Sequence, residues 1–174
     1  MADRNPEEGV YKSAARIKLL LMDCDGVLTD GRLYFSGAGE EMKVFDVKDG
    51  QGLVAWHRSG GISGIISGRS SRIVDLRAAE LGIKFVHQRV EDKIQAFLAI
   101  LAEAYISDPA EVAYVGDDVA DIPLMKKVGL PAAVADAVGE VKAAAAIVTK
   151  AKGGRGAVRE VCDLLLSAVK PREQ

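Results

Sequence analysis

The sequence contains two clusters of acidic residues, each directly after a short apolar run. Asp23 and Asp25 follow the run at 17–22. The second cluster follows the run at 112–115 and consists of Asp117, Asp118 and Asp121. Crowded carboxylates repel one another, so such a group needs a cation or a shared proton. Because magnesium prefers a few carboxylate oxygens and leaves its other positions to water and phosphate, the clusters predict a magnesium site.

A hydroxyl group and a lysine add hydrogen-bond donors to these acids. Ser67 follows a third apolar run at 62–66, and Lys93 begins an amphipathic segment. A phosphate bound between the acids needs donors, which Lys93 and Ser67 with its neighbouring N–H groups can supply. Each motif alone is equally well explained as a capped turn, and Lys93 alone as a solvated helix residue. Only their combination favours a phosphoryl-transfer site.

Apolar runs that end in glycine-containing turns are typical of buried parallel strands. The pattern predicts strands at residues 17–22, 62–66, 83–86, 112–115, 131–134 and 147–149. It predicts helices at residues 52–59, 72–81, 93–105, 121–128, 138–146 and 158–169. Because strands and helices alternate, we expect an α/β fold with a central parallel sheet flanked by helices. Ligands of such folds bind at the carboxyl ends of the strands, where the acids and Ser67 stand.

Composition narrows the class of protein. The 174 residues suit one domain, and the formal charge of -2 argues against nucleic-acid binding. Cys24 and Cys162 form no paired motif, so we expect neither a disulfide nor a zinc site, and a cytoplasmic location fits. The apolar runs are too short to span a membrane. Residues 1–14 are expected to form a flexible arm and not a secretory signal.

The acidic, serine and lysine motifs, in this order, resemble the four motifs of the haloacid dehalogenase superfamily of phosphatases. They are Asp23-x-Asp25, Ser67, Lys93 and Gly116-Asp117-Asp118-x-x-Asp121. The resemblance covers roughly residues 17–134 and implies a Rossmann-like fold. It also implies that Asp23 attacks phosphorus to form an aspartyl-phosphate. Asp25 then protonates the leaving oxygen and later activates water.

The same resemblance implies a ligand set for Mg²⁺. The ion is expected to be held by Asp23, by the backbone carbonyl of Asp25 and by Asp117. Asp118 and Asp121 are expected to orient metal-bound waters or the motif lysine. Two carboxylates in the first motif separate this chain from superfamily members that do not hydrolyse phosphate esters well.

Large substrate caps of this superfamily are inserted after the first or the second motif. Here about 35 residues separate Asp30 from Ser67, and about 23 separate Arg69 from Lys93. These segments leave no room for a cap domain. Residues 32–46 are instead expected to form a β-hairpin with a glycine-rich tip.

Two further segments, at residues 31–52 and 153–162, are similar to the 3-deoxy-D-manno-octulosonate 8-phosphate phosphatase family. The resemblance implies that the chain hydrolyses this sugar acid phosphate in lipopolysaccharide sugar synthesis. It implies substrate contacts from Asp25, Asp46, Val47, Lys48, Asp49, Gly50, Arg69, Arg77 and Lys93. It further implies a capless homotetramer whose hairpins and C-terminal tails, here residues 153–174, close neighbouring sites. Arg155 in the glycine-rich stretch 153–156 is the candidate contact to a neighbouring subunit.

One position departs from this family. Val54 stands where a basic residue is common, so the carboxylate end of the sugar can be held differently. A related substrate, such as 2-keto-3-deoxynononate 9-phosphate, therefore stays open as an alternative. A non-catalytic regulatory partner of a sugar-nucleotide transferase is a second alternative, and the intact Asp23, Asp25 and Lys93 argue against it.

Overall fold

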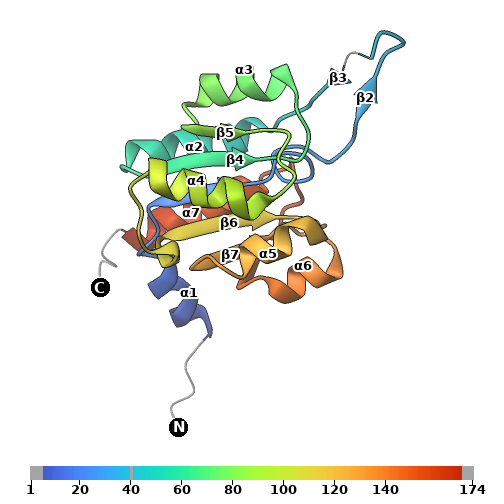
Figure 1. Cartoon of the computed structure of the whole chain (residues 1–174). Helices are drawn as coiled ribbons and strands as arrows, with labels where there is room; N and C mark the ends of the chain where they lie inside the picture. Colours follow the sequence, from blue (N-terminus) through green and yellow to red (C-terminus); the bar gives the residue numbers. More distant parts are fainter. Residues whose placement is uncertain (1–5, 40, 170–174) are drawn as a thin grey trace.

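Six short strands form one parallel sheet in the middle of the molecule (Figure 1). In this computed structural model, residues 6–39 and 41–169 are described. The strands are β1 (Leu19–Met22), β4 (Ile62–Ile66), β5 (Phe85–His87), β6 (Val112–Gly116), β7 (Leu130–Ala133) and β8 (Ile147–Val148). Their spatial order is β5-β4-β1-β6-β7-β8. The predicted α/β fold with a central parallel sheet is confirmed.

Strand register brings the turns that carry the acidic and serine motifs to the same side of the sheet, at the carboxyl ends of the strands. All four residues of β1 are buried, as expected of a strand covered on both faces. Met22, the last residue of β1, pairs with Ile65 of β4 and with Val115 of β6. The turns that follow these three strands therefore open at the same edge, although they come from distant parts of the chain.

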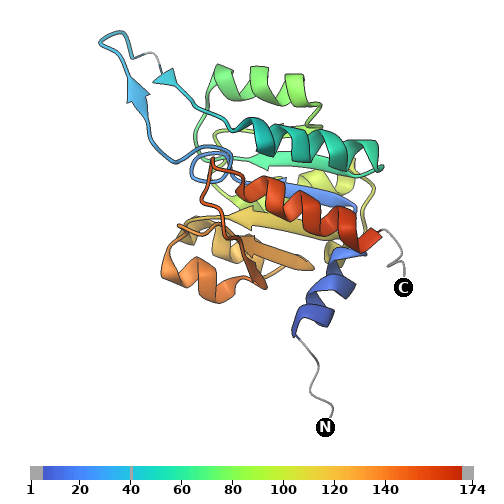
Figure 2. The same ribbon diagram turned by 180° about the vertical axis from the view of Figure 1, so that it is seen from behind.

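Helices cover both faces of the sheet. They are α1 (Pro6–Ala14), α2 (Val47–Arg58), α3 (Arg72–Leu81), α4 (Lys93–Glu103), α5 (Ile122–Met125), α6 (Gly139–Ala144) and α7 (Ala157–Val169). Two short 3₁₀ helices, η1 (Pro109–Glu111) and η2 (Val119–Asp121), precede β6 and α5. Helices α4 and α5 lie on one face, and α2 and α7 lie side by side on the other (Figures 1 and 2). Among the described residues, no helix combines the length and apolar character needed to cross a bilayer.

Helix α2 begins five residues before the sequence pattern predicts. Asp46 caps it, because its side chain accepts a hydrogen bond from the backbone N–H of Lys48 at 2.7 Å. Gly50 and Gly52 lie inside the helix, where they allow close packing. A Cβ atom at Gly52 would lie 3.0 Å from Cδ of Arg159 in α7. These glycines mark a helix–helix contact and not a helix start.

The expected flexible arm at residues 1–14 is wrong for Pro6–Ala14, which form α1. Ala14 is fully buried, and Val10 packs against the core. The helix contacts α7 and β7, so burial of its apolar side stabilises it. Residues 1–5 lie outside the described part of the chain.

The predicted hairpin is present with very short strands. Strands β2 (Tyr34–Phe35) and β3 (Glu41–Met42) pair antiparallel, and the hairpin stands away from the sheet (Figures 1 and 2). Four of its large apolar side chains are exposed: Leu33, Phe35, Met42 and Val44. The described residues contain no inserted domain that could serve as a cap.

The C-terminal region packs on its own chain. Helix α7 buries Val158, Val161 and Leu165 completely or almost completely. The backbone N–H of Gly154 donates to the carbonyl of Val27 at 2.8 Å. A Cβ atom at Gly153 would lie 1.7 Å from the carbonyl oxygen of the neighbouring first-motif loop, so only glycine fits there. Gly153 and Gly154 thus pack against the first-motif loop of their own chain, and a contact of the tail with another subunit stays a prediction. Residues 170–174 are outside the described part of the chain.

Candidate active site

Asp23 is fixed at the end of β1 by two hydrogen bonds. Its Oδ1 atom accepts the backbone N–H of Cys24 at 2.6 Å, and its Oδ2 atom accepts from Nζ of Lys93, also at 2.6 Å. The side chain keeps some exposure to solvent. The carboxylate is therefore held in one orientation at the edge of a cavity, as a nucleophile requires.

Lys93, the first residue of α4, bonds to a second carboxylate besides that of Asp23. Its Nζ atom also donates to Oδ1 of Asp121 at 2.7 Å, and the hydroxyl of Tyr114 donates to that oxygen at 2.5 Å. Burial by itself lowers the pKa of Lys93, but the charges of Asp23 and Asp121 raise it above its ordinary value. The lysine therefore stays charged between two carboxylates.

Asp121 also holds the loop that carries the fourth motif. Its Oδ2 atom accepts the backbone N–H groups of Asp117 at 2.9 Å and of Asp118 at 3.3 Å. Asp118 caps η2 by accepting the N–H of Val119 at 2.7 Å. The structure thus places Asp121 against the lysine and the loop backbone, and it places Asp118 at the rim of the cavity.

Asp117 and Asp23 have the features of carboxylates that bind a cation. Together with Asp121 they offer oxygens within 4.8 Å of one another. Among the described residues, Oδ1 of Asp117 is buried without a hydrogen-bond partner. Burial, with the charges of Asp23 and Asp121, raises the pKa of Asp117 to about 7. Burial raises the pKa of Asp23 to about 6, although Lys93 opposes the shift.

These residues fit a magnesium ion. A divalent cation between Asp23 and Asp117 would neutralise both carboxylates and occupy the unpartnered oxygen. We do not assign Asp121 as a metal ligand, because each of its oxygens already accepts a hydrogen bond. A bound Mg²⁺ supplies positive charge that stabilises phosphoryl oxygens.

Asp25 lies between two cations. Its Oδ1 atom accepts a hydrogen bond from Nζ of Lys43 at 2.5 Å, and Nε of Arg69 lies 3.5 Å from Oδ2. Lys43 was not among the residues that the sequence singled out. The available signal was a lone charge between the apolar Met42 and Val44 on the returning arm of the hairpin.

Ser67 lines the cavity, and its backbone N–H is bonded inside the protein. Its backbone N–H donates to the carbonyl of His87 at 2.9 Å, and the N–H of Arg69 donates to the Ser67 hydroxyl at 3.3 Å. The N–H groups of Ser67 and Arg69 are therefore bonded within the protein, and the N–H of Gly68, which lines the cavity, stays a predicted donor to phosphate. The cavity measures about 210 Å³ and is lined by Asp23, Asp25, Ser67, Gly68, Arg69, Lys93, Asp117, Asp118 and Ala120.

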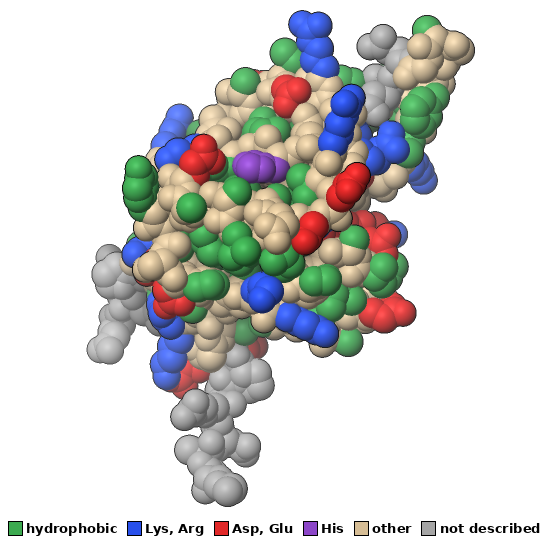
Figure 3. All heavy atoms as spheres, in the orientation of Figure 1, with side chains coloured by type: hydrophobic (Ala, Val, Ile, Leu, Met, Phe, Trp, Pro, Cys, Tyr) green, Lys and Arg blue, Asp and Glu red, His purple; other side chains and the backbone are tan. Residues whose placement is uncertain are grey.

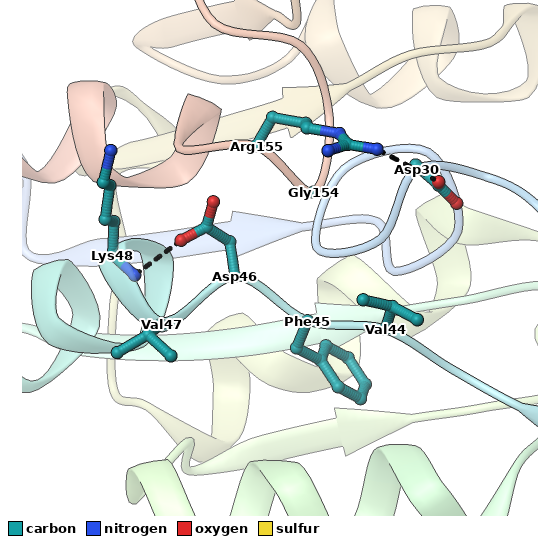
Figure 4. A pocket seen from close by; sticks show the side chains of 8 residues that line it. All are labelled: Asp30, Val44, Phe45, Asp46, Val47, Lys48, Gly154 and Arg155. Carbon is teal, nitrogen blue, oxygen red and sulfur yellow. Dashed lines mark hydrogen bonds and ion pairs between the residues drawn. The ribbon is translucent and has the colours of Figure 1, made fainter.

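Asp46, Val47 and Lys48 line a different cavity, of about 360 Å³ (Figure 4). Its other lining residues are Asp30, Val44, Phe45, Gly154 and Arg155. Arg155 reaches Asp30 of its own chain, with a nitrogen 3.9 Å from the carboxylate, as the dashed line in Figure 4 shows. Arg155 thus forms an ion pair within its own chain, and its predicted contact to a neighbouring subunit stays a prediction.

The side chain of Asp49 is turned away from every cavity described above. It is buried, and its two oxygens accept the backbone N–H groups of Arg159 at 2.8 Å and Gly156 at 3.2 Å. It therefore caps the start of α7 and joins α2 to it. The predicted substrate contact of this side chain is wrong, because Asp49 is 1% exposed and lines none of these cavities.

Arg77 lies next to the cavity that Asp46, Val47 and Lys48 line, and it does not line the catalytic cavity. Its guanidinium group sits 5.7 Å from the ring centre of Phe45 and donates to Glu80 at 2.9 Å. Gly50 packs against it, since a Cβ atom there would lie 2.6 Å from a guanidinium nitrogen. Arg77 lines a cavity of about 350 Å³ that shares Phe45 and Val47 with the one in Figure 4.

A partly buried aspartate held by a lysine, a second carboxylate and acids that fit magnesium, all at the carboxyl ends of a parallel sheet, are typical of a phosphoryl-transfer hydrolase. The chain belongs to the haloacid dehalogenase-like hydrolases, because the model of that family matches residues 66–161. Relatives and solved structures agree with this class.

Similar proteins share most of this chain. It is 48% identical over 159 residues to the 3-deoxy-D-manno-octulosonate 8-phosphate phosphatase of Escherichia coli K12, covering 91% of this chain and 84% of the relative. A crystal structure of the Yersinia pestis enzyme of that name has a TM-score of 0.91 and 46% identity, covering 93% and 87% of the two chains.

A further similar structure was solved with a metal ion, phosphate and a sugar acid. It is the Moraxella catarrhalis 3-deoxy-D-manno-octulosonate 8-phosphate phosphatase, in complex with a magnesium ion, a phosphate ion and the sugar acid KDO. It has a TM-score of 0.88 and 42% identity, and covers 91% of each chain.

Proposed function

We propose that this protein is a Mg²⁺-dependent phosphatase that hydrolyses 3-deoxy-D-manno-octulosonate 8-phosphate in lipopolysaccharide sugar synthesis. The observation that carries the proposal is the arrangement of Asp23, Asp25 and Lys93 around one cavity, with Asp23 only 2.6 Å from the lysine. The names of the similar enzymes support this substrate. We also propose that the protein works in the cytoplasm, which suits its buried free thiols.

The reaction has two steps at phosphorus. An Asp23 oxygen attacks and forms a bond to phosphorus, while the bond to the sugar oxygen breaks and Asp25 gives that oxygen a proton. Asp25 next accepts a proton from water as the water attacks the aspartyl-phosphate, which releases phosphate and regenerates Asp23. Lys93 and the Ser67 hydroxyl stabilise negative charge on the phosphoryl group.

The magnesium site completes this assignment. We propose Asp23, Asp117 and the backbone carbonyl of Asp25 as ligands. Asp121 keeps Lys93 in place through its 2.7 Å ion pair, and Asp118 faces the cavity, where it can orient a metal-bound water. The unpartnered oxygen and the raised pKa of Asp117 support this ligand set.

Positive side chains support recognition of a dianionic substrate. In the space-filling view, basic side chains gather between α3 and the base of the hairpin (Figure 3). Arg69 is part of the catalytic cavity and stacks on Phe35, with its guanidinium 5.9 Å from the ring centre. We propose that Arg69 meets the substrate at this cavity. Lys48 and Arg77, from the neighbouring cavities, meet the sugar acid farther away.

One observation keeps a longer sugar acid as a second candidate. Val54, where a basic residue is common in similar enzymes, packs partly buried against the core and has no charge to offer a carboxylate. A substrate such as 2-keto-3-deoxynononate 9-phosphate would present its carboxylate at a different distance from the phosphate.

A substrate panel tests the proposal. We expect the highest kcat/KM for 3-deoxy-D-manno-octulosonate 8-phosphate, with the nononate ester and simple hexose phosphates at least about tenfold lower. A higher value for the nononate ester would select the second candidate. Equal and low values for all sugar phosphates, with normal hydrolysis of para-nitrophenyl phosphate, would contradict a sugar acid phosphatase.

We further propose a homotetramer in which neighbouring subunits cover the open site. The exposed Phe35, Met42 and Val44 present more apolar surface than a two-stranded ribbon normally leaves in water. Packing hairpins against each other in a closed symmetric assembly would bury it. Light scattering of the active enzyme should report a mass four times that of the chain, and a fully active monomer would contradict this arrangement.

A further inference from the structure

The returning arm of the hairpin contacts the acid–base residue directly. Lys43 is the first residue after β3, and its Nζ atom donates to Oδ1 of Asp25 at 2.5 Å. The Lys43 side chain is only 2% exposed, whereas that of Arg69, on the other oxygen of Asp25, is 44% exposed. The two cations therefore differ in accessibility. Lys43 is buried, whereas Arg69 is open to solvent and to a ligand.

Lys43 approaches Asp25 from outside the catalytic cavity. The residues lining that cavity include Asp25 and Arg69 but not Lys43. A phosphate group in the cavity would thus meet Asp25 and Arg69 first. Through its ion pair with the Asp25 carboxyl group, Lys43 can therefore affect the reaction without lining the cavity.

The pair also anchors the hairpin. Its neighbours Met42 and Val44 are exposed, and so is Phe35 across the ribbon. Between Met42 and Val44 the Lys43 side chain is buried, and a buried ammonium group is costly unless a carboxylate pairs with it. The position of the hairpin and the orientation of Asp25 are therefore linked through one ion pair.

We propose that Lys43 is a positioning residue, whose ion pair holds the Asp25 carboxyl group in the orientation that proton transfer needs. The proposal rests on the proposed function, in which Asp25 is the general acid and base. A charged lysine only donates hydrogen bonds. It can therefore orient the Asp25 carboxyl group without accepting the proton that this group transfers. Displacing the hairpin arm would then turn Asp25 and slow the reaction.

Steady-state kinetics with a simple alkyl phosphate, whose alkoxide leaving group needs a proton, test this role independently of the natural substrate. We expect Lys43→Met to lower kcat by about 10- to 100-fold with KM changed less than about threefold, because a misplaced catalytic group lowers the rate without weakening binding. Lys43→Arg should restore much of kcat. Lys18→Met is the matched control, since it removes a 2.7 Å ion pair with Glu111 that is remote from the cavity.

A double-mutant cycle with Asp25→Asn separates positioning from other roles. If Lys43 acts through Asp25, Lys43→Met should change the kcat of Asp25→Asn less than about twofold. A full additional loss in that background, or an unchanged kcat for Lys43→Met alone, would overturn the proposal. An unchanged kcat for Asp25→Asn would instead refute the acid–base assignment of the proposed function.

Thermal unfolding of each variant guards against a folding artefact. Should Lys43→Met fail to fold, Lys43→Gln keeps a shorter, uncharged donor and is measured in its place. We expect Lys43→Gln to show a reduced kcat at near-normal unfolding temperature. Normal kcat in Lys43→Gln would count against the proposal equally.

Discussion

Gly26 lies directly over the carboxylate of Asp117. A Cβ atom on Gly26 would be 2.0 Å from Oδ2 of Asp117, and Gly26 itself has φ of +90°. The turn after the nucleophile and the loop of the fourth motif thus approach so closely that only glycine fits between them. This contact fixes the separation of the two carboxylates that we assign to magnesium.

Gly26→Ala should therefore damage the metal site. The added methyl group must displace Asp117, so we expect weaker Mg²⁺ binding and a loss of kcat/KM of about 100-fold or more. Isothermal titration with Mg²⁺ and steady-state kinetics measure the two effects. Gly139→Ala is the control, because a Cβ there meets no atom within 4 Å. Normal Mg²⁺ affinity in Gly26→Ala would contradict the assignment of Asp117 as a ligand.

The two carboxylates of the first motif should respond differently to conversion into amides. Asp23→Asn should abolish turnover, since an amide cannot form the acyl-phosphate. Asp25→Asn should keep Mg²⁺ binding nearly intact and lose about 10²–10⁴-fold in kcat. Trapping of phosphorylated protein after acid quench distinguishes the steps. Near-normal activity of Asp23→Asn would refute the nucleophile assignment.

Stabilisation by Mg²⁺ should increase with pH. In the metal-free protein, Asp117 has a pKa of about 7 and Asp23 of about 6, both above the ordinary value of 3.8. Between pH 3.8 and about pH 7 the folded state therefore holds more protons than the unfolded state. The free energy of unfolding falls as the pH rises through this range.

Mg²⁺ binds the deprotonated carboxylates, so it offsets this loss. We expect the rise in unfolding temperature caused by Mg²⁺ to be larger at about pH 8 than at about pH 5, and to vanish in Asp117→Asn. EDTA should abolish activity, and added Mg²⁺ should restore it. Full activity of metal-stripped protein would rule out the site.

Arg77→Ala should affect the sugar acid selectively. Arg77 lines a cavity that shares Phe45 and Val47 with the one containing Lys48, and it does not line the cavity of the acids. We therefore expect KM for the sugar acid phosphate to rise about tenfold or more while KM for para-nitrophenyl phosphate stays within about twofold. Arg58→Ala, at the exposed end of α2, is the control. Equal losses for both substrates would indicate that Arg77 serves folding or phosphate binding.

Deletion of residues 153–174 should unfold the protein. Helix α7 contributes Val158, Val161 and Leu165 to the core, and each buried side chain of this size stabilises the fold by about 1.5–3 kcal/mol. Their sum is comparable with the total stability of an ordinary domain, about 5–15 kcal/mol. Circular dichroism should show loss of cooperative unfolding. A folded truncated protein that lacks only activity would instead favour a tail that serves a neighbouring site.

The sequence alone was enough to predict the strands, their parallel arrangement and most of the residues that line one cavity. The apolar runs before Asp23, Ser67 and Asp117 are local patterns, and parallel strands end at one edge whatever their order. For the same reason the acids, Lys93 and Arg69 meet at one cavity as expected.

Only the tertiary structure decided what the polar side chains near this cavity bind. Asp49 looked like a substrate residue, but it bonds Gly156, which lies 107 positions away in the sequence. Lys43 stands on a hairpin arm, and its 2.5 Å contact with Asp25 depends on how that arm folds back. Such pairings depend on distances between separate elements, and a one-dimensional pattern carries no information about them.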